Sequence, residues 1–543
     1  MTMKLTENKF FLYATGFFSG MSIMAVEMGA SRLLTPYFSS SQIVWTVIIG
    51  TIMIAMAIGN VWGGRSADKN PDPMRLYRRL LIAAAWIALI PFLGRFIILG
   101  VTYVVIQIAH SQYLIWASLF SCLFIFVFPL LLLGTVTPSL IKYATTSLSD
   151  NGQVVGMLEA CGTIGSILGT FLPTFVTIPD FGTAITFYIF AAILAILALL
   201  FFIARGKGRA PAAAVTAIIA ALIFIPFDYS FAFWESDIVY EDESIYNYLR
   251  VQETERSMIL STNVLEGVQS IYMKDGGLTG MYYDYALAAP LMTKDGPGDV
   301  VPQRGEAVVP GDPAVKERAA SPSLLVLGMG TGTYARQCRT YFPDMVMEGV
   351  EIDQKIVDLS HVYFDLPSDI PVACEDGRAY LRNAGMYDII MVDAYQDITI
   401  PFQMSSKEFF ELLKEHLNEG GVLVLNMNMK QNEEGGINDY IIDTVASVFP
   451  SVVTVPVGAN TNLELFASLD EAMVARFEER VSYLPEGELK NQMLRVADSL
   501  AFEEGGPLIL TDDKAPVERL GMKALDAIIR DALDDIGDIR DYL

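Results

Sequence analysis

The stretch that decides the fold of the second half of the chain is Leu324-Leu-Val-Leu-Gly328-Met-Gly330-Thr-Gly332. A helical pattern over 334–342 follows, and then an apolar run over 346–350 that ends in Glu351-Ile-Asp353. Strand, glycine-rich turn, helix, strand and acid form a Rossmann-like βαβ unit. The glycines permit a close approach of the backbone to a ligand, and a carboxylate after the second strand can accept both hydrogen bonds of a ribose diol. Because Gly-x-Gly-x-Gly differs from the dinucleotide spacing, the motif favours a nucleoside of the S-adenosyl type over NAD.

Two further acidic positions lie downstream of this unit. Glu375-Asp376-Gly377 precedes a predicted helix and can place the Asp376 carboxylate near the amino group of an adenine. Tyr387-Asp-Ile-Ile-Met-Val-Asp393 has the pattern of a buried strand that ends in an acid. Because α/β sheets carry their chemistry at the carboxyl ends of their strands, we predict that Asp393 is functional rather than a helix or turn cap.

Hydropathy and charge divide the chain into two unlike parts. Of its 543 residues, 52% are hydrophobic and 18% are charged, and the net charge is −25. The first 210 residues hold 13 Lys and Arg against 7 Asp and Glu, whereas the rest hold 24 against 55. This split disfavours a single soluble domain, and the acidic part disfavours nucleic acid as a partner. The four cysteines and three histidines show no ligand spacing, so we expect no metal site.

Residues 1–230 are predicted to form a transmembrane helical bundle of seven or eight helices. Most of its apolar stretches approach the roughly 20 residues that a helix needs to cross a bilayer. The stretches are 10–30, 43–62, 80–93, 114–133, 154–178, 184–203 and 212–227. Together they predict a multi-pass protein of the cell membrane.

The basic loops set the orientation of this bundle. Basic residues gather at 65–79 and 205–209, which indicates that both loops face the cytoplasm. Seven simple crossings would then place the acidic part outside the cell. Either 96–109 is an additional crossing or one stretch is re-entrant, and we expect a cytoplasmic catalytic domain because the nucleoside that it is predicted to bind is made inside cells.

The acidic part is predicted to be an α/β region in four segments. A small β-sheet unit spans 235–293, with β-rich runs at 245–252, 257–262, 270–273 and in a polar-aromatic stretch that continues to Met292. Residues 294–321 are rich in Pro, Gly and charge and are predicted to be a flexible insertion. A Rossmann-like domain of the class I methyltransferase type follows over 322–470, and a polar helical region over 471–543.

The order of these motifs resembles the spermidine synthase (polyamine aminopropyltransferase) family, in particular its membrane-fused members. The glycine loop, Glu351, Asp376-Gly377 and Tyr387–Asp393 follow in the order and spacing of the family. Segments on either side also resemble it, and they are Tyr246-Asn247, Leu265-Glu-Gly267, Tyr282-Tyr283-Asp284 and Leu510–Glu518. With similar matches in the membrane part, the resemblance covers nearly the whole chain.

The resemblance implies a role for each matching residue. Asp393 would be the catalytic proton acceptor that orients and deprotonates an attacking amine. The nucleoside would be bound by Asn247, Gly328, Gly330, Gly332, Glu351, Asp376 and Gly377, with Glu351 on the ribose and Asp376 on the adenine edge. The substrate would be bound by Tyr283, Asp284, Thr331, Tyr395 and Gln396. The implied reaction is displacement at the propyl carbon of decarboxylated S-adenosylmethionine, which releases methylthioadenosine and needs no metal.

Two of these positions depart from the pattern of the family. Thr331 stands where the family has an aspartate that binds the cationic aminopropyl end of the donor. Gln396 stands where the Asp-Ser-Ser-Asp motif has its second acid. Loss of these carboxylates weakens selection for a dicationic diamine, and at 331 it also removes repulsion against an intact methionine carboxylate.

Three functions therefore stay open. The first is a membrane-bound aminopropyltransferase that acts on a small polyamine. The second is an S-adenosylmethionine-dependent methyltransferase acting on an amphiphilic substrate from the bilayer. The third is a polyamine transporter or sensor whose cytosolic domain only binds. Asp393, with Tyr395 nearby, favours an enzyme, and the expected partners are a small-molecule amine, the lipid bilayer and, from the resemblance, a second copy in a homodimer.

Overall fold

The computed structural model describes residues 8–39, 41–109, 111–145, 151–225, 230–264, 267–297, 322–395, 400–427, 434–458 and 462–541, with side chains to residue 530. Contacts within the chain define two compact units. The first comprises Met1–Glu235, Glu241–Tyr248 and Asn263–Leu265. The second comprises Ser236–Tyr240, Leu249–Thr262 and Glu266–Leu543. Most of the predicted insertion, 294–321, and the predicted substrate residue Gln396 lie outside the described residues.

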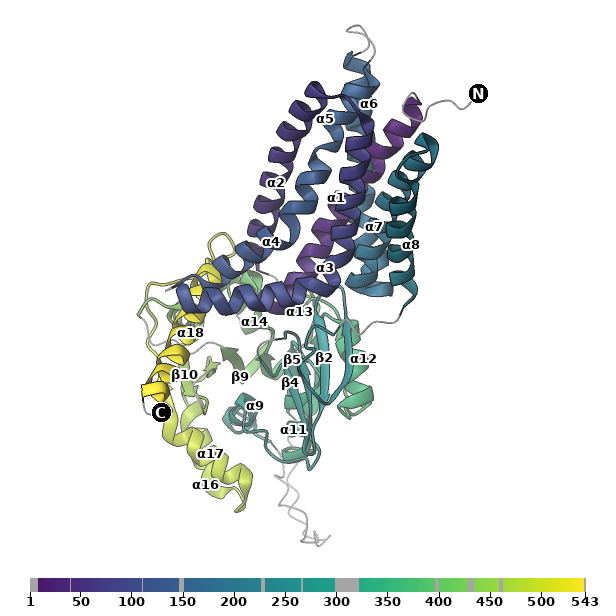
Figure 1. Ribbon diagram of the computed structural model, residues 1–543. Coiled ribbons are helices and arrows are strands. Elements are labelled where there is room, and N and C mark those ends of the chain that lie inside the picture. Colours follow the sequence, from purple (N-terminus) through teal and green to yellow (C-terminus); the bar gives the residue numbers. More distant parts are fainter. Residues whose placement is uncertain are drawn as a thin grey trace. The chain divides into compact units, whose positions relative to one another are not determined.

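The first unit is built from apolar helices (Figure 1). Their bounds are α1 Lys9–Phe38, α2 Gln42–Lys69, α3 Pro73–Ile108, α4 Tyr113–Gly134, α5 Val136–Ala144, α6 Asn151–Leu172, α7 Ile178–Arg205 and α8 Arg209–Phe224, with a π-helical turn at Pro173–Thr177. In the described part of the chain, five helical stretches are long and apolar enough to cross a membrane. They are Lys9–Phe38, Gln42–Lys69, Pro73–Ile108, Tyr113–Ala144 and Asn151–Arg205.

The helix is interrupted at one of the two predicted gaps between apolar stretches and is continuous across the other. The 55-residue stretch Asn151–Arg205 is interrupted at Gly182, whose φ of 82° and ψ of 166° are not helical. By contrast, α3 runs without such a break through 36 residues, so 96–109 continues the third helix instead of forming a separate crossing. At 1.5 Å per residue this helix is about 54 Å long, which exceeds the roughly 30 Å hydrocarbon core of a bilayer.

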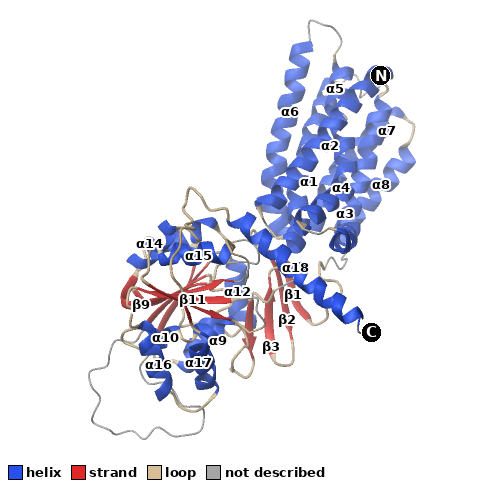
Figure 2. Cartoon of the chain, turned by 90° about the vertical axis from the view of Figure 1, so that its left-hand side faces the viewer, coloured by secondary structure: helices blue, strands red, loops and turns tan. Residues whose placement is uncertain are grey.

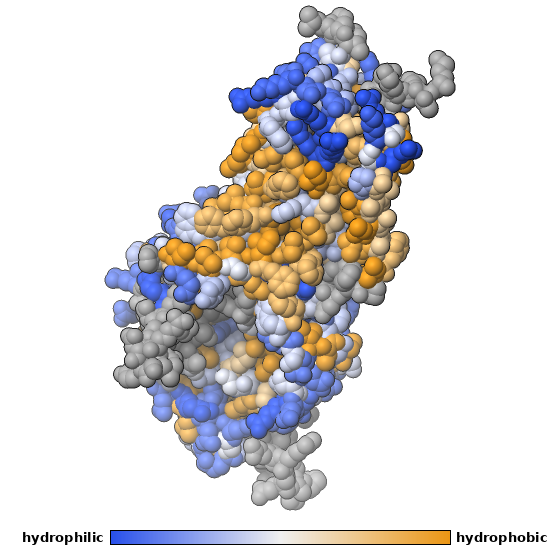
Figure 3. Space-filling view, in the orientation of Figure 1, coloured by the Kyte–Doolittle hydropathy of each residue, from blue (hydrophilic) through white to orange (hydrophobic). Residues whose placement is uncertain are grey.

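Small residues let α1 and α6 pack backbone against backbone. A Cβ added at Gly165 would lie 2.0 Å from the carbonyl oxygen of Phe17, and one at Gly169 would lie 2.0 Å from that of Met21. Such close approach is typical of helices that associate within a bilayer. On the outside, large apolar side chains stay exposed, and orange residues gather over the middle of this unit in Figure 3.

A small four-stranded sheet has the order β1-β2-β3-β4. Its strands are β1 Ile238–Glu243, β2 Tyr248–Glu253, β3 Ser257–Ser261 and β4 Ser270–Met273. The prediction that the polar-aromatic stretch to Met292 belongs to this β unit is wrong, because the stretch forms two short helices, α9 Tyr282–Ala286 and α10 Ala289–Met292. Its alanines and leucines favour a helix, and Pro290 stands in the first turn of α10, where its missing N–H costs nothing.

The second unit contains an eight-stranded sheet with helices on both faces (Figure 2). Its strands are β5 Ser323–Leu327, β6 Val346–Glu351, β7 Val372–Cys374, β8 Tyr387–Val392, β9 Leu417–Met427, β10 Ser451–Pro456, β11 Leu463–Ser468 and β12 Ala501–Phe502. Its helices are α11 Thr333–Tyr341, α12 Gln354–Tyr363, α13 Gly377–Leu381, the 3₁₀ turn Phe402–Met404, α14 Lys407–Glu415, α15 Ile437–Ala446, α16 Met473–Tyr483, α17 Glu488–Ser499 and α18 Val517–Asp541. The α/β prediction for this part of the chain is confirmed.

The strand order places the predicted motifs at one crevice. The order is β12-β10-β11-β9-β8-β5-β6-β7, in which β7, β6, β5, β8 and β9 are parallel, β11 is antiparallel to β9, and β10 is antiparallel to both β11 and β12. From β5 the chain continues to β6 and β7 on one side, and it then returns to β8 and β9 on the other. Open α/β sheets bind ligands at such a switch point, outside the carboxyl ends of the strands. The glycine loop follows β5 and Asp393 follows β8, so both lie at this crevice.

Candidate active site

The glycine loop is shaped by positive φ angles and by close neighbours. Gly328 and Gly332 both have a φ of 84°, and that of Gly330 is 53°. A Cβ at Gly328 would lie 2.5 Å from the carbonyl oxygen of Asp393, and one at Gly330 would lie 2.5 Å from Ser270 Oγ. The loop therefore needs glycine both for its conformation and for its contact with the chain after β8.

Glu351, at the end of β6, is tied to this loop. Its Oε2 accepts a hydrogen bond from the Gly330 N–H at 2.9 Å, and its Oε1 accepts one from the Asp353 N–H at 3.1 Å. The side chain is 6% exposed, and burial raises its pKa to about 7, against the lowering effect of these backbone hydrogen bonds. Each oxygen keeps a lone pair with which a ribose hydroxyl can bond.

Asp393 is buried and is held by two side chains. Its Oδ1 accepts a hydrogen bond from Asn426 Nδ2 at 2.9 Å, and its Oδ2 accepts one from the Tyr282 hydroxyl at 2.8 Å. Burial raises the pKa of Asp393 to about 7, the two hydrogen bonds lower it, and the charge of Glu351 raises it. A carboxylate with a pKa near neutrality is suited to general-base catalysis.

Sequence reasoning missed the two residues that hold Asp393. Asn426 lies in β9, and its Oδ1 accepts a hydrogen bond from Asn462 Nδ2 at 2.8 Å, so its amide group is orientated with the nitrogen toward Asp393. Its signal in the sequence is a polar residue inside the apolar run 422–427. In the sequence, Tyr282 stands out only as part of the segment Tyr282-Tyr283-Asp284, and nothing in that segment indicates a hydrogen bond to Asp393.

The remaining residues predicted to bind the nucleoside are placed as follows. Asp376 caps α13, because its Oδ1 accepts a hydrogen bond from the Ala379 N–H at 2.8 Å, and Gly377 is the first residue of that helix. Asn247 belongs to the first unit, in the turn between β1 and β2, where its N–H donates to Ser244 Oγ at 2.8 Å. Nucleoside binding by these three residues stays a prediction.

Four of the residues predicted to bind substrate are buried in the second unit. The Tyr283 hydroxyl donates to the carbonyl of Gln269 at 2.8 Å, and that of Tyr395 donates to the carbonyl of Met404 at 2.8 Å. The Thr331 N–H donates to Ser270 Oγ at 3.1 Å. These contacts organise the walls of the crevice, and substrate binding by the three side chains stays a prediction.

Asp284, the fourth of these residues, already has several donors around its carboxylate. Oδ1 accepts hydrogen bonds from the N–H and the hydroxyl of Thr279, at 2.9 and 2.8 Å, and from Gln337 Nε2 at 2.6 Å. Oδ2 accepts one from the Gly280 N–H at 2.6 Å. This carboxylate therefore fixes the turn before α9, and through α9 the position of Tyr282.

In the described residues, no group of three or more His, Cys, Asp or Glu side chains could hold a metal ion.

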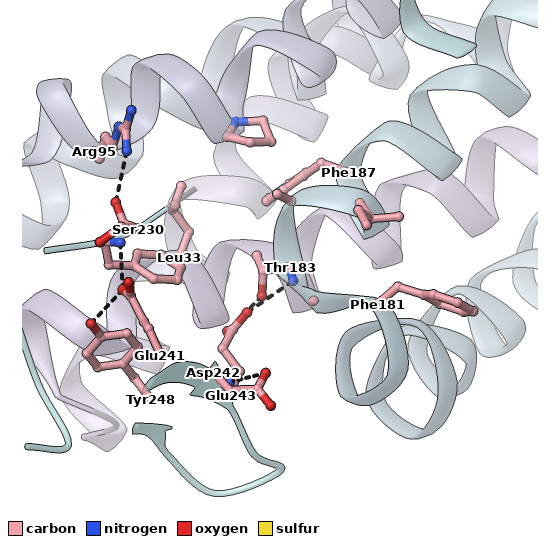
Figure 4. Close-up of a pocket in the computed structure, with 15 residues that line it drawn as sticks. Leu33, Arg95, Phe181, Thr183, Phe187, Ser230, Glu241, Asp242, Glu243 and Tyr248 are labelled. Carbon is pink, nitrogen blue, oxygen red and sulfur yellow. Dashed lines mark hydrogen bonds between the residues drawn. The ribbon is translucent and has the colours of Figure 1, made fainter. Parts of the chain in front are cut away.

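The first unit has a separate pocket of about 330 Å³ (Figure 4). Glu243 lies in its wall, and its carboxylate accepts hydrogen bonds from the N–H and the hydroxyl of Thr183, at 3.0 and 2.8 Å. Thr183 follows the break at Gly182, so Glu243 caps the point at which α7 resumes. Burial raises the pKa of Glu243. Both carboxylate oxygens thus have structural partners.

A second carboxylate in this pocket also has structural partners. Glu241 Oε1 accepts hydrogen bonds from the Phe231 N–H at 2.9 Å and from the Tyr248 hydroxyl at 2.6 Å. Across the pocket, Arg95 donates to the carbonyl of Ser230 at 2.8 Å (Figure 4). Glu241, Glu243 and Arg95 thus each bond to groups of the first unit, and we assign the pocket no ligand.

The fold is a Rossmann-like α/β domain with a buried acid, Asp393, at the switch point of its sheet, and the comparisons with known proteins give its family. The model of the spermine/spermidine synthase domain matches residues 315–471. A probable polyamine aminopropyl transferase of Bifidobacterium longum is 48% identical over 340 residues, which cover 58% of this chain and 71% of that protein. A polyamine aminopropyltransferase of Vibrio vulnificus is 27% identical over 207 residues, 36% of this chain and 61% of that protein.

Among solved structures, a probable spermidine synthase from Corynebacterium glutamicum aligns with a TM-score of 0.36 and 16% identity, over 50% of this chain and 98% of that one. From the identity to the Bifidobacterium protein and the extent of that match, the chain belongs to the spermine/spermidine synthase family. It is an enzyme, a transferase of the aminopropyltransferase type. This confirms the family predicted from the motifs.

Proposed function

We propose that the protein is a membrane-bound aminopropyltransferase that moves the aminopropyl group of decarboxylated S-adenosylmethionine to a polyamine. One observation carries this proposal: Asp393, a buried base held by Asn426 and Tyr282, follows β8 at the crevice where the glycine loop follows β5. A nucleoside on the glycine loop and Glu351 would bring its sulfonium centre toward this base. The donor is a substrate, and no step calls for a metal.

The reaction needs a neutral amine in line with the bond that breaks. The amine nitrogen forms a bond to the propyl carbon, and the bond between that carbon and sulfur breaks with its electron pair going to sulfur. The sulfonium thereby becomes the neutral thioether of methylthioadenosine. The attacking nitrogen gives a proton to Asp393 Oδ1 or Oδ2. Tyr282 and Asn426 fix the orientation of this carboxylate while it accepts the proton.

The apolar helices support attachment to a bilayer. Many large apolar side chains on them are exposed, among them Phe10, Met53, Tyr103, Ile108 and Phe175, which are each 66–78% exposed. So many exposed apolar side chains on long helices are typical of a surface that faces lipid. We place the catalytic domain in the cytoplasm, where its nucleoside donor is made. The homodimer stays a prediction from the resemblance.

The environment of Thr331 favours an S-adenosylmethionine-dependent methyltransferase as the second candidate function. Its side chain is 1% exposed, and its hydroxyl has no hydrogen-bond partner within the part of the chain that the structure describes. A neutral hydroxyl at this point in the glycine loop tolerates the carboxylate of intact S-adenosylmethionine, which an aspartate would repel.

The product released from the donor distinguishes these functions. Purified full-length protein is incubated with decarboxylated or intact S-adenosylmethionine and a panel of amines, and the products are identified by mass spectrometry. Methylthioadenosine released with an aminopropylated amine supports the aminopropyltransferase. S-adenosylhomocysteine supports the methyltransferase, and nucleoside binding without either product would support the binding-only sensor or transporter. Asp393→Asn should abolish turnover and largely spare nucleoside affinity, whereas unchanged turnover would refute its role as the base.

A further inference from the structure

Glu464, in β11, is a buried acid that the mechanism above does not use. Its side chain is 0% exposed, and neither carboxylate oxygen has a hydrogen-bond partner among the described residues. The other buried acids of this unit are different, since Glu351 accepts from two backbone N–H groups and Asp393 accepts from two side chains. A buried polar group without a partner costs free energy, and a charged one costs more. The protein therefore keeps a costly group at this position.

The strand register places Glu464 beside the base. In the antiparallel pair of β11 and β9, Glu464 is directly opposite Asn426. Residues that face each other across two strands project to the same side, with Cβ atoms about 4.5–5.5 Å apart. Asn426 donates to Asp393 from this position. Glu464 is thus the cross-strand neighbour of Asn426, and Asn426 is the residue that orientates Asp393.

Electrostatics also link the two acids. Burial raises the pKa of Glu464 well above its ordinary value, and the charge of Asp393 raises it further. A cation close to both Glu464 and Asp393 would lower the pKa of each, because it favours the ionised carboxylates.

We propose that Glu464 binds the second ammonium group of the amine acceptor, while Asp393 receives the proton of the attacking nitrogen. The acceptor is then a primary diamine or a longer polyamine, and the carboxylate that selects it comes from β11. This rests on the proposed aminopropyl transfer. The carboxylate of Glu464 would also compensate for the two acids of the family pattern that are absent at Thr331 and Gln396, although Glu464 is distant in sequence from both positions.

The test compares a diamine with a monoamine of the same chain length. Full-length wild type and Glu464→Gln are assayed with decarboxylated S-adenosylmethionine and either 1,4-diaminobutane or butylamine. We expect the substitution to raise KM for the diamine by about tenfold or more, to leave kcat for the diamine within about twofold, and to leave KM for butylamine unchanged. A structural role would alter both acceptors alike, so equal effects on the two amines, or no effect, would overturn the proposal.

Glu464→Asp supplies a second variant in case the Gln variant does not fold. It keeps the charge but shortens the side chain by one methylene, so the preferred acceptor should shift from 1,4-diaminobutane toward 1,5-diaminopentane. An unchanged order of preference would count against Glu464. Glu348→Gln is the matched control, since Glu348 is a carboxylate of the same sheet that accepts a hydrogen bond from the Tyr387 hydroxyl, and it should alter neither KM.

A failure of this inference differs from a failure of the proposed function. If the wild type transfers an aminopropyl group to no amine, the proposed function fails before Glu464 is tested. If the wild type is active and Glu464→Gln keeps its preference for the diamine, only the role of Glu464 is refuted.

Discussion

Removing the donor that Asn426 supplies should shift the pH dependence of the enzyme in a defined direction. Asn426→Leu deletes the hydrogen bond to Asp393 Oδ1, which is 2.9 Å long, and leaves the 2.8 Å bond from Tyr282 to Oδ2. Burial raises the pKa of Asp393 to about 7, and the hydrogen bond from Asn426 lowers it. Without that bond the pKa rises further, because the bond stabilises the ionised form.

The size of the shift follows from the strength of such a bond. A hydrogen bond to a charged group contributes about 1.5–3 kcal/mol. Since one pKa unit corresponds to about 1.4 kcal/mol, the pKa of Asp393 should rise by about 1–2 units. Transfer needs the carboxylate form, so the acid limb of kcat/KM should move from about pH 7 to about pH 8–9. At pH 7 this lowers kcat/KM by about 5- to 50-fold, and the rate recovers as the pH is raised.

The assay is the release of methylthioadenosine from decarboxylated S-adenosylmethionine between pH 5.5 and about 9.5, a range that brackets the expected limbs. Asn418→Leu is the matched control, because Asn418 Nδ2 donates to Asp388 Oδ1 at 2.9 Å between the same two strands. It should leave the limb in place. A limb that stays near pH 7 in Asn426→Leu, or a loss of rate that is the same at every pH, would refute the assignment of Asp393 as the titrating base.

Three further predictions concern other parts of the chain. Gly328→Ala should lower the stability by about 1–3 kcal/mol in thermal unfolding and abolish activity. The new Cβ would lie 2.5 Å from the carbonyl oxygen of Asp393, and the φ of 84° at position 328 is unfavourable for alanine. An active variant of unchanged stability would contradict this. Glu243→Ala should lower the free energy of unfolding in detergent by about 1–3 kcal/mol, because the N–H and the hydroxyl of Thr183 lose their acceptor. Glu243→Gln keeps an acceptor oxygen and should lower the stability less, and equal losses in the two variants would refute the capping role of Glu243. A membrane-impermeant maleimide should label the exposed Cys374 only after cells are permeabilised, with Cys374→Ser as control, and labelling of intact cells would refute the cytoplasmic placement.

The parts of the site that follow from sequence are those set by short-range pattern. An apolar strand, a glycine loop and an acid at the next strand end lie within one βαβ unit, so their spacing predicts Glu351. Asp393 is predicted by a second local pattern, the apolar strand Tyr387–Val392 that ends in an acid. Asn426 and Glu464 could not be predicted in this way. They reach the site only because β8, β9 and β11 are neighbours in the sheet, and that order depends on contacts between segments distant in the chain.

In the helical part, the hydropathy pattern predicts the wrong end for the third helix. Arg95 ends an apolar stretch in the sequence, and yet α3 continues through it. Its guanidinium donates to the carbonyl of Ser230 and lies over the rings of Phe96 and Phe233, with 5.1 and 4.7 Å to the ring centroids. These partners come largely from a segment more than a hundred residues away, so hydropathy alone places a boundary where the structure has none.

The raised pKa values of the three buried acids explain why an acidic crevice is compatible with a folded protein. Burial raises the pKa of Glu351 and Asp393 to about 7 and that of Glu464 well above its ordinary value. For Glu351 and Asp393 the native state holds protons that the unfolded state releases above about pH 4, so their contribution to stability falls as the pH rises from about 4 through 7. The raised pKa of Glu464 acts in the same direction. The sulfonium donor and the ammonium acceptor of the proposed function would reverse this, because cations favour the ionised carboxylates. Under the proposed function, it is therefore the local arrangement of these three acids, and not the large negative charge of the domain, that would suit the crevice to cationic substrates.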